Sequence, residues 1–265
     1  KTIEDEFGFP VLIRGKGGVR LTENGRALLP AIREILNAND HMDQIVANIR
    51  GMSFGRLRIG TFASASVLWL PKIIEEFSHD YPGIQIEIIV GGNDSLISQL
   101  DESCIDFAIM SNPPQGYEWI HLASDRMLVL LPPGHRLVDK DRVTLDEIDD
   151  DPFILSNEGF DYDVSQIIKG SGITPRLSFS TMENRGIIAM IQHGLGVTVM
   201  PEMVLDSLES NVITKELAPC EYRHMGIIVK SVHTASLAAK TFISYAKRII
   251  SELGTYPPID GELNA

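Results

Sequence analysis

The sequence is short of several features that mark particular classes of protein. Its 265 residues include two cysteines, Cys104 and Cys220, too few for a disulfide framework, so we expect free thiols in a reducing compartment. Whether they have a redox role stays open. No stretch approaches the roughly 18–20 consecutive apolar residues of a membrane helix, and the charged opening segment does not resemble a secretion signal. We therefore expect a cytoplasmic protein that does not contact a membrane.

The usual signatures of metal binding and catalysis are also missing from the sequence. The seven histidines are widely separated and neither cysteine belongs to a CxxC pair, so no metal site is expected. No nucleophile elbow or phosphate-binding loop occurs, and the lone Gly194-Leu195-Gly196 is more typical of a helix end than of a nucleotide site. These absences predict a protein that is not an enzyme and that holds no cofactor.

Positive charge is scarce and unevenly placed. The net charge is -13, yet residues 1–50 carry seven basic and seven acidic residues and sum to zero. A protein that coats nucleic acid along its whole surface is therefore excluded. Contact with DNA is limited to the first segment, where residues 12–33 contain five basic residues and one acid.

The stretch L-I-R-G-K-G-G-V-R-L-T-E-N-G, residues 12–25, predicts a two-stranded wing followed by a helix. Two short apolar strands surround a glycine turn, and Thr22 is a good N-cap. The basic residues of this wing are candidates for contacts with DNA phosphates, although a solvated hairpin is the plainer alternative. The candidate residues are Arg14, Lys16 and Arg20.

After the wing, apolar residues recur at alternating steps of four and three, which is the seam of a coiled coil with one polar position. The seam consists of Leu28, Ile32, Ile35, Asn39, Met42, Val46 and Ile49. We expect it to join two copies of the chain, with the asparagine setting the register. An amphipathic helix that packs on its own domain is the alternative.

From Leu57 onward, strands and helices alternate, which predicts parallel sheets with helices on both faces. The expected strands are 57–60, 84–90, 105–110, 127–131, 153–155, 177–180, 196–200 and 225–230. The expected helices are 66–79, 94–100, 164–169, 183–193, 201–208 and 236–253. About 200 residues suit two lobes better than one sheet, with crossings near 139–152 and 219–224.

Three loops of small polar residues follow predicted strands and open predicted helices: 61–66, 91–94 and 180–185. In an open parallel sheet such loops meet at one edge, where ligands bind, and free amides at helix starts suit an anion. Simple capping explains each loop singly. Three loops at equivalent positions favour a binding cleft for a small anion.

Residues 4–30 closely resemble the end of the winged helix-turn-helix and the start of the linker helix of LysR-type transcriptional regulators. The resemblance continues to about residue 252. It is carried by R-L-R-I-G-T at 56–61, F-S-H-D-Y-P-G at 77–83, I-D-F-A-I at 105–109, L-P-P-G-H at 131–135 and G-L-G-V-T-V-M-P at 194–201.

The resemblance implies a two-lobed fold like that of periplasmic binding proteins, with an inducer bound between the lobes. It implies effector contacts at Thr61, Ser64, Ser66, Asn93, Asn157, Asp161 and Asn184. The family's recognition helix would precede the first residue of this sequence, so we expect the chain not to read DNA sequence by itself.

The sequence therefore predicts the inducer-binding and oligomerising part of a DNA-binding regulator, acting as a homodimer or homotetramer. The expected divisions are a wing remnant at 1–21, a linker helix at 22–54 and an effector domain at 55–265. Its first lobe would hold 55–148 and 225–253, and its second lobe 149–224. A solute-binding protein of a transport system shares the two-lobed architecture and is the alternative.

Overall fold

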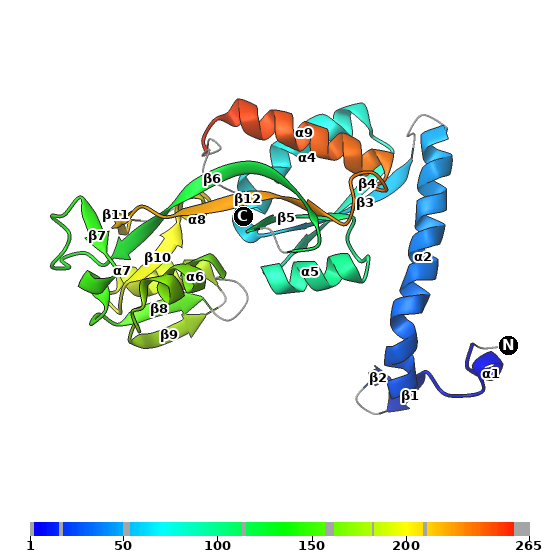
Figure 1. Ribbon diagram of the computed structural model, residues 1–265, viewed down its shortest axis with the longest axis horizontal. Helices are drawn as coiled ribbons and strands as arrows, with labels where there is room; N and C mark the ends of the chain where they lie inside the picture. The colour runs from blue at the N-terminus through cyan, green and yellow to red at the C-terminus, as the bar shows by residue number, and fades with distance from the viewer. Residues whose placement is uncertain are drawn as a thin grey trace.

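A computed structural model describes residues 3–15, 18–49, 54–112, 115–156, 162–181, 183–208 and 211–256 of the chain. A long helix stands to one side of a two-lobed α/β body (Figure 1). Within the described residues, no helix combines the length and apolar character that crossing a membrane requires.

The wing forms as the sequence predicts. Strands β1 (Leu12–Gly15) and β2 (Gly18–Leu21) pair in antiparallel fashion. The Thr22 hydroxyl accepts from the Gly25 amide at 2.9 Å and so caps helix α2 (Glu23–Ile49). Before the wing, the short helix α1 (Ile3–Phe7) supplies the Glu4 carboxylate, which accepts from the amides of Val11 and Leu12. Local hydrogen bonds thus attach the wing to both neighbouring helices.

The first lobe is built on strands β3 (Gly55–Thr61), β4 (Ile84–Val90), β5 (Phe107–Ser111) and β12 (Tyr222–Val229). Helices α4 (Leu70–Asp80) and α9 (Leu237–Leu253) cover one face, where Phe77, Phe107 and Phe242 form the aromatic centre of the core. Helix α5 (Asn93–Asp101) covers the other face (Figure 1). The short α3 (Ala63–Leu68) precedes α4, and the two together replace the single helix expected at 66–79.

The second lobe surrounds the far half of strand β6 (Glu118–Leu131), which pairs with β10 (Thr198–Pro201) and β11 (Ile213–Ala218). Strand β7 (Arg142–Thr144) adds to β11, while β8 (Phe153–Ser156) and β9 (Leu177–Thr181) form a separate parallel pair. The helices are α6 (Tyr162–Ser171), α7 (Asn184–Gln192), α8 (Glu202–Asp206) and a 3₁₀ turn, η1 (Asp146–Ile148).

The lobes are joined by strands rather than by loops alone. The near half of β6 pairs with β12 in the first lobe, so β6 carries the chain into the second lobe and β12 begins its return (Figure 1). The crossing expected at 139–152 is therefore wrong. Val143, Leu145 and Ile148 pack in the second lobe's core with Met127 and Phe153. Residues 127–148, predicted in the first lobe, belong to the second.

The sheets are mixed, which corrects the prediction of parallel sheets. β3 is parallel to β4 and β5, but β12 is antiparallel to β5 and β6, and β10 and β11 are antiparallel to β6. The reason is that outgoing and returning strands lie side by side and run in opposite directions. Strands β7 and β11, which the sequence pattern did not predict, extend the sheet in the second lobe.

Candidate functional site

A cavity of about 260 Å³ lies between the two lobes. The first lobe contributes residues that follow β3 and β4 and the last residue of β5, and the second contributes the starts of α6, α7 and α8. Its described lining consists of Phe62, Ala63, Ser64, Val90, Gly91, Gly92, Asn93, Ser111, Tyr162, Asp163, Glu183, Asn184, Met200, Pro201, Val204 and Arg223.

The strand directions explain why these residues meet. β3, β4 and β5 are parallel neighbours, so their carboxyl ends lie at one edge of the first lobe's sheet. Asn93 is held there by its side-chain amide, which donates to the Ser111 carbonyl at 2.9 Å. The loop after β9 brings Glu183 and Asn184 to the same cavity from the second lobe.

Ser64 has an unusual environment within the cavity wall. The residue is only 3% exposed, and within the described part of the chain its hydroxyl has no hydrogen-bond partner. A buried hydroxyl without a partner costs free energy, and native proteins rarely leave one unsatisfied. The Ser64 hydroxyl is therefore suited to a polar group of a bound ligand.

Two nine-residue helices begin at the cavity, one from each lobe. The N-cap of α5 is Gly92, which has no side chain to accept from the first-turn amides. The N-cap of α7 is Glu183, which makes no capping hydrogen bond to the described residues. Free amides and the positive ends of two helix dipoles favour a negatively charged group on a ligand.

Two of the charged side chains at the cavity, Arg223 and Asp163, already make side-chain hydrogen bonds. Buried Arg223 donates through Nε and Nη2 to the two oxygens of buried Asp125, at 2.9 and 2.7 Å, and lies over the ring of Phe62. The Asp163 carboxylate accepts from the Ser111 hydroxyl at 2.8 Å. Burial raises the pKa of Asp163, and the nearby Arg223 guanidinium opposes that rise.

The predicted effector residues divide into three groups. Ser64, Asn93 and Asn184 lie in the cavity wall. Thr61 and Ser66 are not part of the lining, and their hydroxyls donate to the carbonyls of Phe62 and Ala63. Two residues of a helix two positions apart point about 200° apart, so Ser64 and Ser66 cannot both face the cavity. Asn157 and Asp161 lie outside the described residues.

The sequence interpretation missed Ser111, Asp163 and Arg223. Ser111 ends a strand parallel to β3, so the rule that selected the other loops could have selected it. Arg223 offered a weaker signal, a single basic residue beside the predicted strand 225–230. Nothing near Asp163 in the sequence indicates its partners, which lie more than 50 residues away.

Arg14 and Arg20 of the wing are exposed, but they do not share a face. Arg20 lies opposite Ile13 in the hairpin and Arg14 lies opposite Val19. Directly opposed residues of an antiparallel pair point to the same side, so Arg14 and Arg20 point to opposite sides. Lys16, the third predicted contact, lies outside the described residues.

The predicted seam of α2 lies largely open in the single chain. Leu28 and Ile32 are half-buried, whereas Ile35, Met42 and Ile49 are 70, 56 and 81% exposed. Val46 is also exposed, and the Asn39 amide contacts Asp43 on the same helix at 3.5 Å.

Among the described residues, no group of three potential metal ligands occurs.

Comparisons with known proteins agree with this architecture. Residues 50–250 match the family model described as the LysR substrate binding domain. The uncharacterized HTH-type transcriptional regulator YvbU of Bacillus subtilis is 34% identical over 250 residues, covering 93% of this chain and 86% of that protein.

Solved structures share the fold at lower sequence identity. A full-length OxyR variant from Pseudomonas aeruginosa superposes with a TM-score of 0.74 at 20% identity, covering 98% of this chain and 86% of that one. The effector binding domain of QuiR in complex with shikimate has a TM-score of 0.68 at 20% identity, covering 76% of this chain and 99% of that one.

Proposed function

Because this chain belongs to the LysR family of transcriptional regulators, we propose that its two-lobed body senses a small molecule in the interlobe cavity. The observation that carries this proposal is the buried Ser64 hydroxyl, which lacks a partner and lies in the cavity wall. The relatives are regulators, which supports this function over that of a transport protein. The chain would act in the cytoplasm by binding rather than by catalysis.

The effector would be a small carboxylate that also carries hydroxyl groups. Its negative charge would meet the first-turn amides of α5 and α7, and its hydroxyls would pair with Ser64 and the amides of Asn93 and Asn184. Shikimate, which the related QuiR domain binds, has this chemistry. Asn157 and Asp161 remain candidate contacts on the strength of the family resemblance.

Two further parts of the chain complete the proposed regulator. Arg14, Lys16 and Arg20 of the wing would contact the DNA backbone, with Arg14 and Arg20 on the two sides of the hairpin, supplementing the family's recognition helix. The α2 seam would join two copies in a dimer, which can assemble further into a tetramer. A ligand that binds one arrangement of lobes or subunits more tightly would shift the population toward it.

A thermal-shift screen of small hydroxylated carboxylates, including shikimate, tests the site. A true effector raises the melting temperature, because it binds the folded state alone. We expect Ser64→Ala to weaken that ligand by roughly 10-fold, the effect of losing one hydrogen bond to a ligand hydroxyl. The unliganded variant should be at least as stable as the wild type, since an unsatisfied buried hydroxyl has been removed.

Ser66→Ala is the matched control, because this hydroxyl is two residues away but bonds to the Ala63 carbonyl. It should leave the ligand's dissociation constant unchanged. If every ligand in the screen binds the Ser64→Ala protein as tightly as the wild type, the proposed site is wrong.

A further inference from the structure

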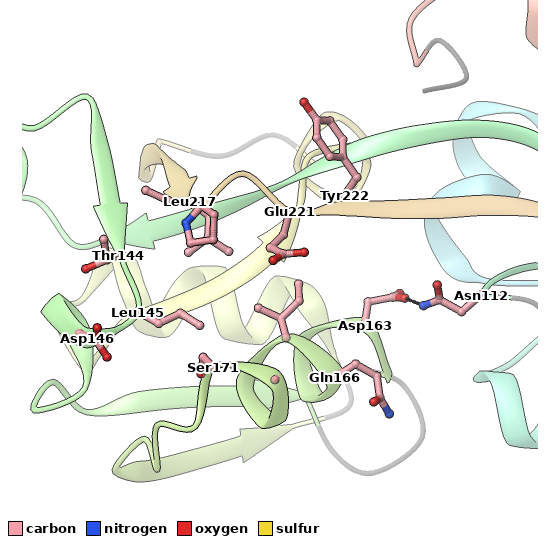
Figure 2. Close-up of a pocket in the computed structure, with 14 residues that line it drawn as sticks. Asn112, Thr144, Leu145, Asp146, Asp163, Gln166, Ser171, Leu217, Glu221 and Tyr222 are labelled. Carbon is pink, nitrogen blue, oxygen red and sulfur yellow. Dashed lines mark hydrogen bonds between the residues drawn. The ribbon is translucent and has the colours of Figure 1, made fainter. Parts of the chain in front are cut away.

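Asp163 joins the two lobes through its carboxylate. It lies in the first turn of α6, in the second lobe, and accepts from Ser111 Oγ at 2.8 Å and from Asn112 Nδ2 at 2.5 Å. Both donors belong to the first lobe, at the end of β5. Figure 2 shows Asp163 reaching across to Asn112. Both oxygens of one half-buried carboxylate are therefore used to hold the other lobe.

The same carboxylate also belongs to two cavities. Asp163 lines the interlobe cavity together with Ser111, and it lines a second cavity of about 580 Å³ together with Asn112. The second cavity lies between α6 and the segment where β11 ends and β12 begins (Figure 2). A ligand in the interlobe cavity thus meets both Asp163 and its partner Ser111.

Two charged groups act on Asp163 from the strands that cross between the lobes, and the acidic residues Glu183 and Glu221 line the same two cavities. Arg223 on β12 attracts its charge, and Asp125 on β6 repels it. Burial and the Asp125 charge disfavour the ionised form of Asp163, whereas the Arg223 guanidinium and the Ser111 hydrogen bond favour it. The burial effect is the largest, so the pKa of Asp163 lies above its usual value in this arrangement of the lobes.

We propose that Asp163 is an interlobe latch. Its hydrogen bonds with Ser111 and Asn112 hold the lobes in this arrangement, and a ligand in the interlobe cavity alters the arrangement by changing those bonds. The link to the occupant rests on the proposed effector function. The latch itself does not, because its hydrogen bonds join protein residues only. Other contacts between the lobes remain, such as that of Tyr256 with Asp206, so losing the latch loosens the lobes rather than separating them.

The latch has a defined pH dependence. Burial raises the pKa of Asp163 above its usual value in the folded protein. A raised carboxyl pKa means that the latched state favours the proton, so the latch is strongest below the ordinary aspartate range. It weakens as the pH rises through the raised pKa. Asparagine copies the neutral acid: in both, an oxygen accepts from Asn112, and the other atom donates to the Ser111 hydroxyl, which then accepts instead of donating.

The test measures the distance between the lobes in the ligand-free chain. Spin labels are placed at Glu75→Cys on α4 and Gln192→Cys on α7, both exposed, after Cys104 and Cys220 are changed to serine. Double electron–electron resonance then gives the distribution of distances between the two labels at several pH values. We expect Asp163→Ala to raise the population of a longer or broader distance about tenfold. Asp163→Asn should keep the low-pH wild-type distribution at every pH.

Asp146→Ala is the control, because Asp146 lines the second cavity but is exposed. It should leave the distances unchanged. The latch is refuted if Asp163→Ala matches the wild type, or if Asp163→Asn behaves as Asp163→Ala does. The effector site is tested separately, by whether Ser64→Ala weakens the ligands found in the thermal-shift screen. The effector site and the latch can therefore fail independently.

Discussion

One buried ion pair stands at the point where the chain crosses between its lobes. Asp125 of β6 and Arg223 of β12 lie opposite each other in the sheet, and both are buried. Asp125 also accepts from the Met203 amide at 3.0 Å, at the start of α8. The pair therefore links both crossing strands to a helix of the second lobe. Charges buried this deeply persist only when each is well partnered.

Removing one member of this pair should be costly. Asp125→Ala leaves the Arg223 guanidinium buried without its counter-charge, and we expect the free energy of unfolding to fall by about 3–5 kcal/mol. Urea denaturation followed by circular dichroism measures it. The double variant Asp125→Leu/Arg223→Met should be more stable than the single variant, because no lone charge remains.

The exposed pair of Arg142 and Glu216 is the comparison. Arg142→Ala should change the free energy of unfolding by less than about 1 kcal/mol, because solvent screens exposed ion pairs. Similar losses for Asp125→Ala and Arg142→Ala would show that the buried pair has no special role.

At the scale of elements, the pairing of strand β12 with β6 requires a close approach of the two backbones at Gly226. Its register shifts between Met225 and Gly226. A Cβ atom on Gly226 would lie 2.5 Å from the Ile120 carbonyl oxygen and 2.7 Å from the ring of Trp119. Real carbon atoms do not approach backbone oxygen so closely. Glycine is required there because the two crossing strands pack too tightly for a side chain.

Gly226→Ala should therefore force the two crossing strands apart. We expect the free energy of unfolding to fall by roughly 1–3 kcal/mol, the usual cost of overpacking. Gly170→Ala is the matched control, because that glycine lies in α6 with open space around its Cβ position. It should raise stability by up to about 1 kcal/mol through the helix propensity of alanine. Equal effects of the two changes in denaturation would contradict this account.

At the scale of the whole molecule, α2 presents an apolar stripe with no partner in the single chain. Leu36 and Ile45, beside the predicted seam, are also exposed and widen the stripe. A helix that leaves so much apolar surface in water gains free energy when a second copy covers it. Apart from the ion pair of Arg33 with Glu102, the body of the protein does little to cover α2.

A charge in the seam should separate the copies. We expect the wild-type chain to be dimeric or tetrameric by light scattering after size exclusion, and Ile35→Glu to shift it to monomer. Burying two glutamates against each other would cost more free energy than the remaining apolar contacts of the seam contribute. Gln44→Glu, at the heptad position opposite the seam, should leave the oligomer intact. A wild-type chain that stays monomeric at high concentration would refute the seam.

By itself, the sequence determined the local structure and the family of this protein. Residue periodicity, the Thr22 cap and the glycine turn predicted the wing, α2 and most helices and strands, because these depend on neighbours within a few residues. The predicted loops at 61–66, 91–94 and 180–185 contain Ser64, Asn93 and Asn184, which the family resemblance named as effector contacts.

Only the tertiary structure decided the direction of the crossing strands and the partners of the buried charges. Asp163 meets Ser111 across 52 residues, and Arg223 meets Asp125 across 98. Pairings at such separations arise from how strands lie side by side, which no local pattern encodes. A charged residue in the sequence therefore looks like solvated surface until the fold shows that it joins two lobes.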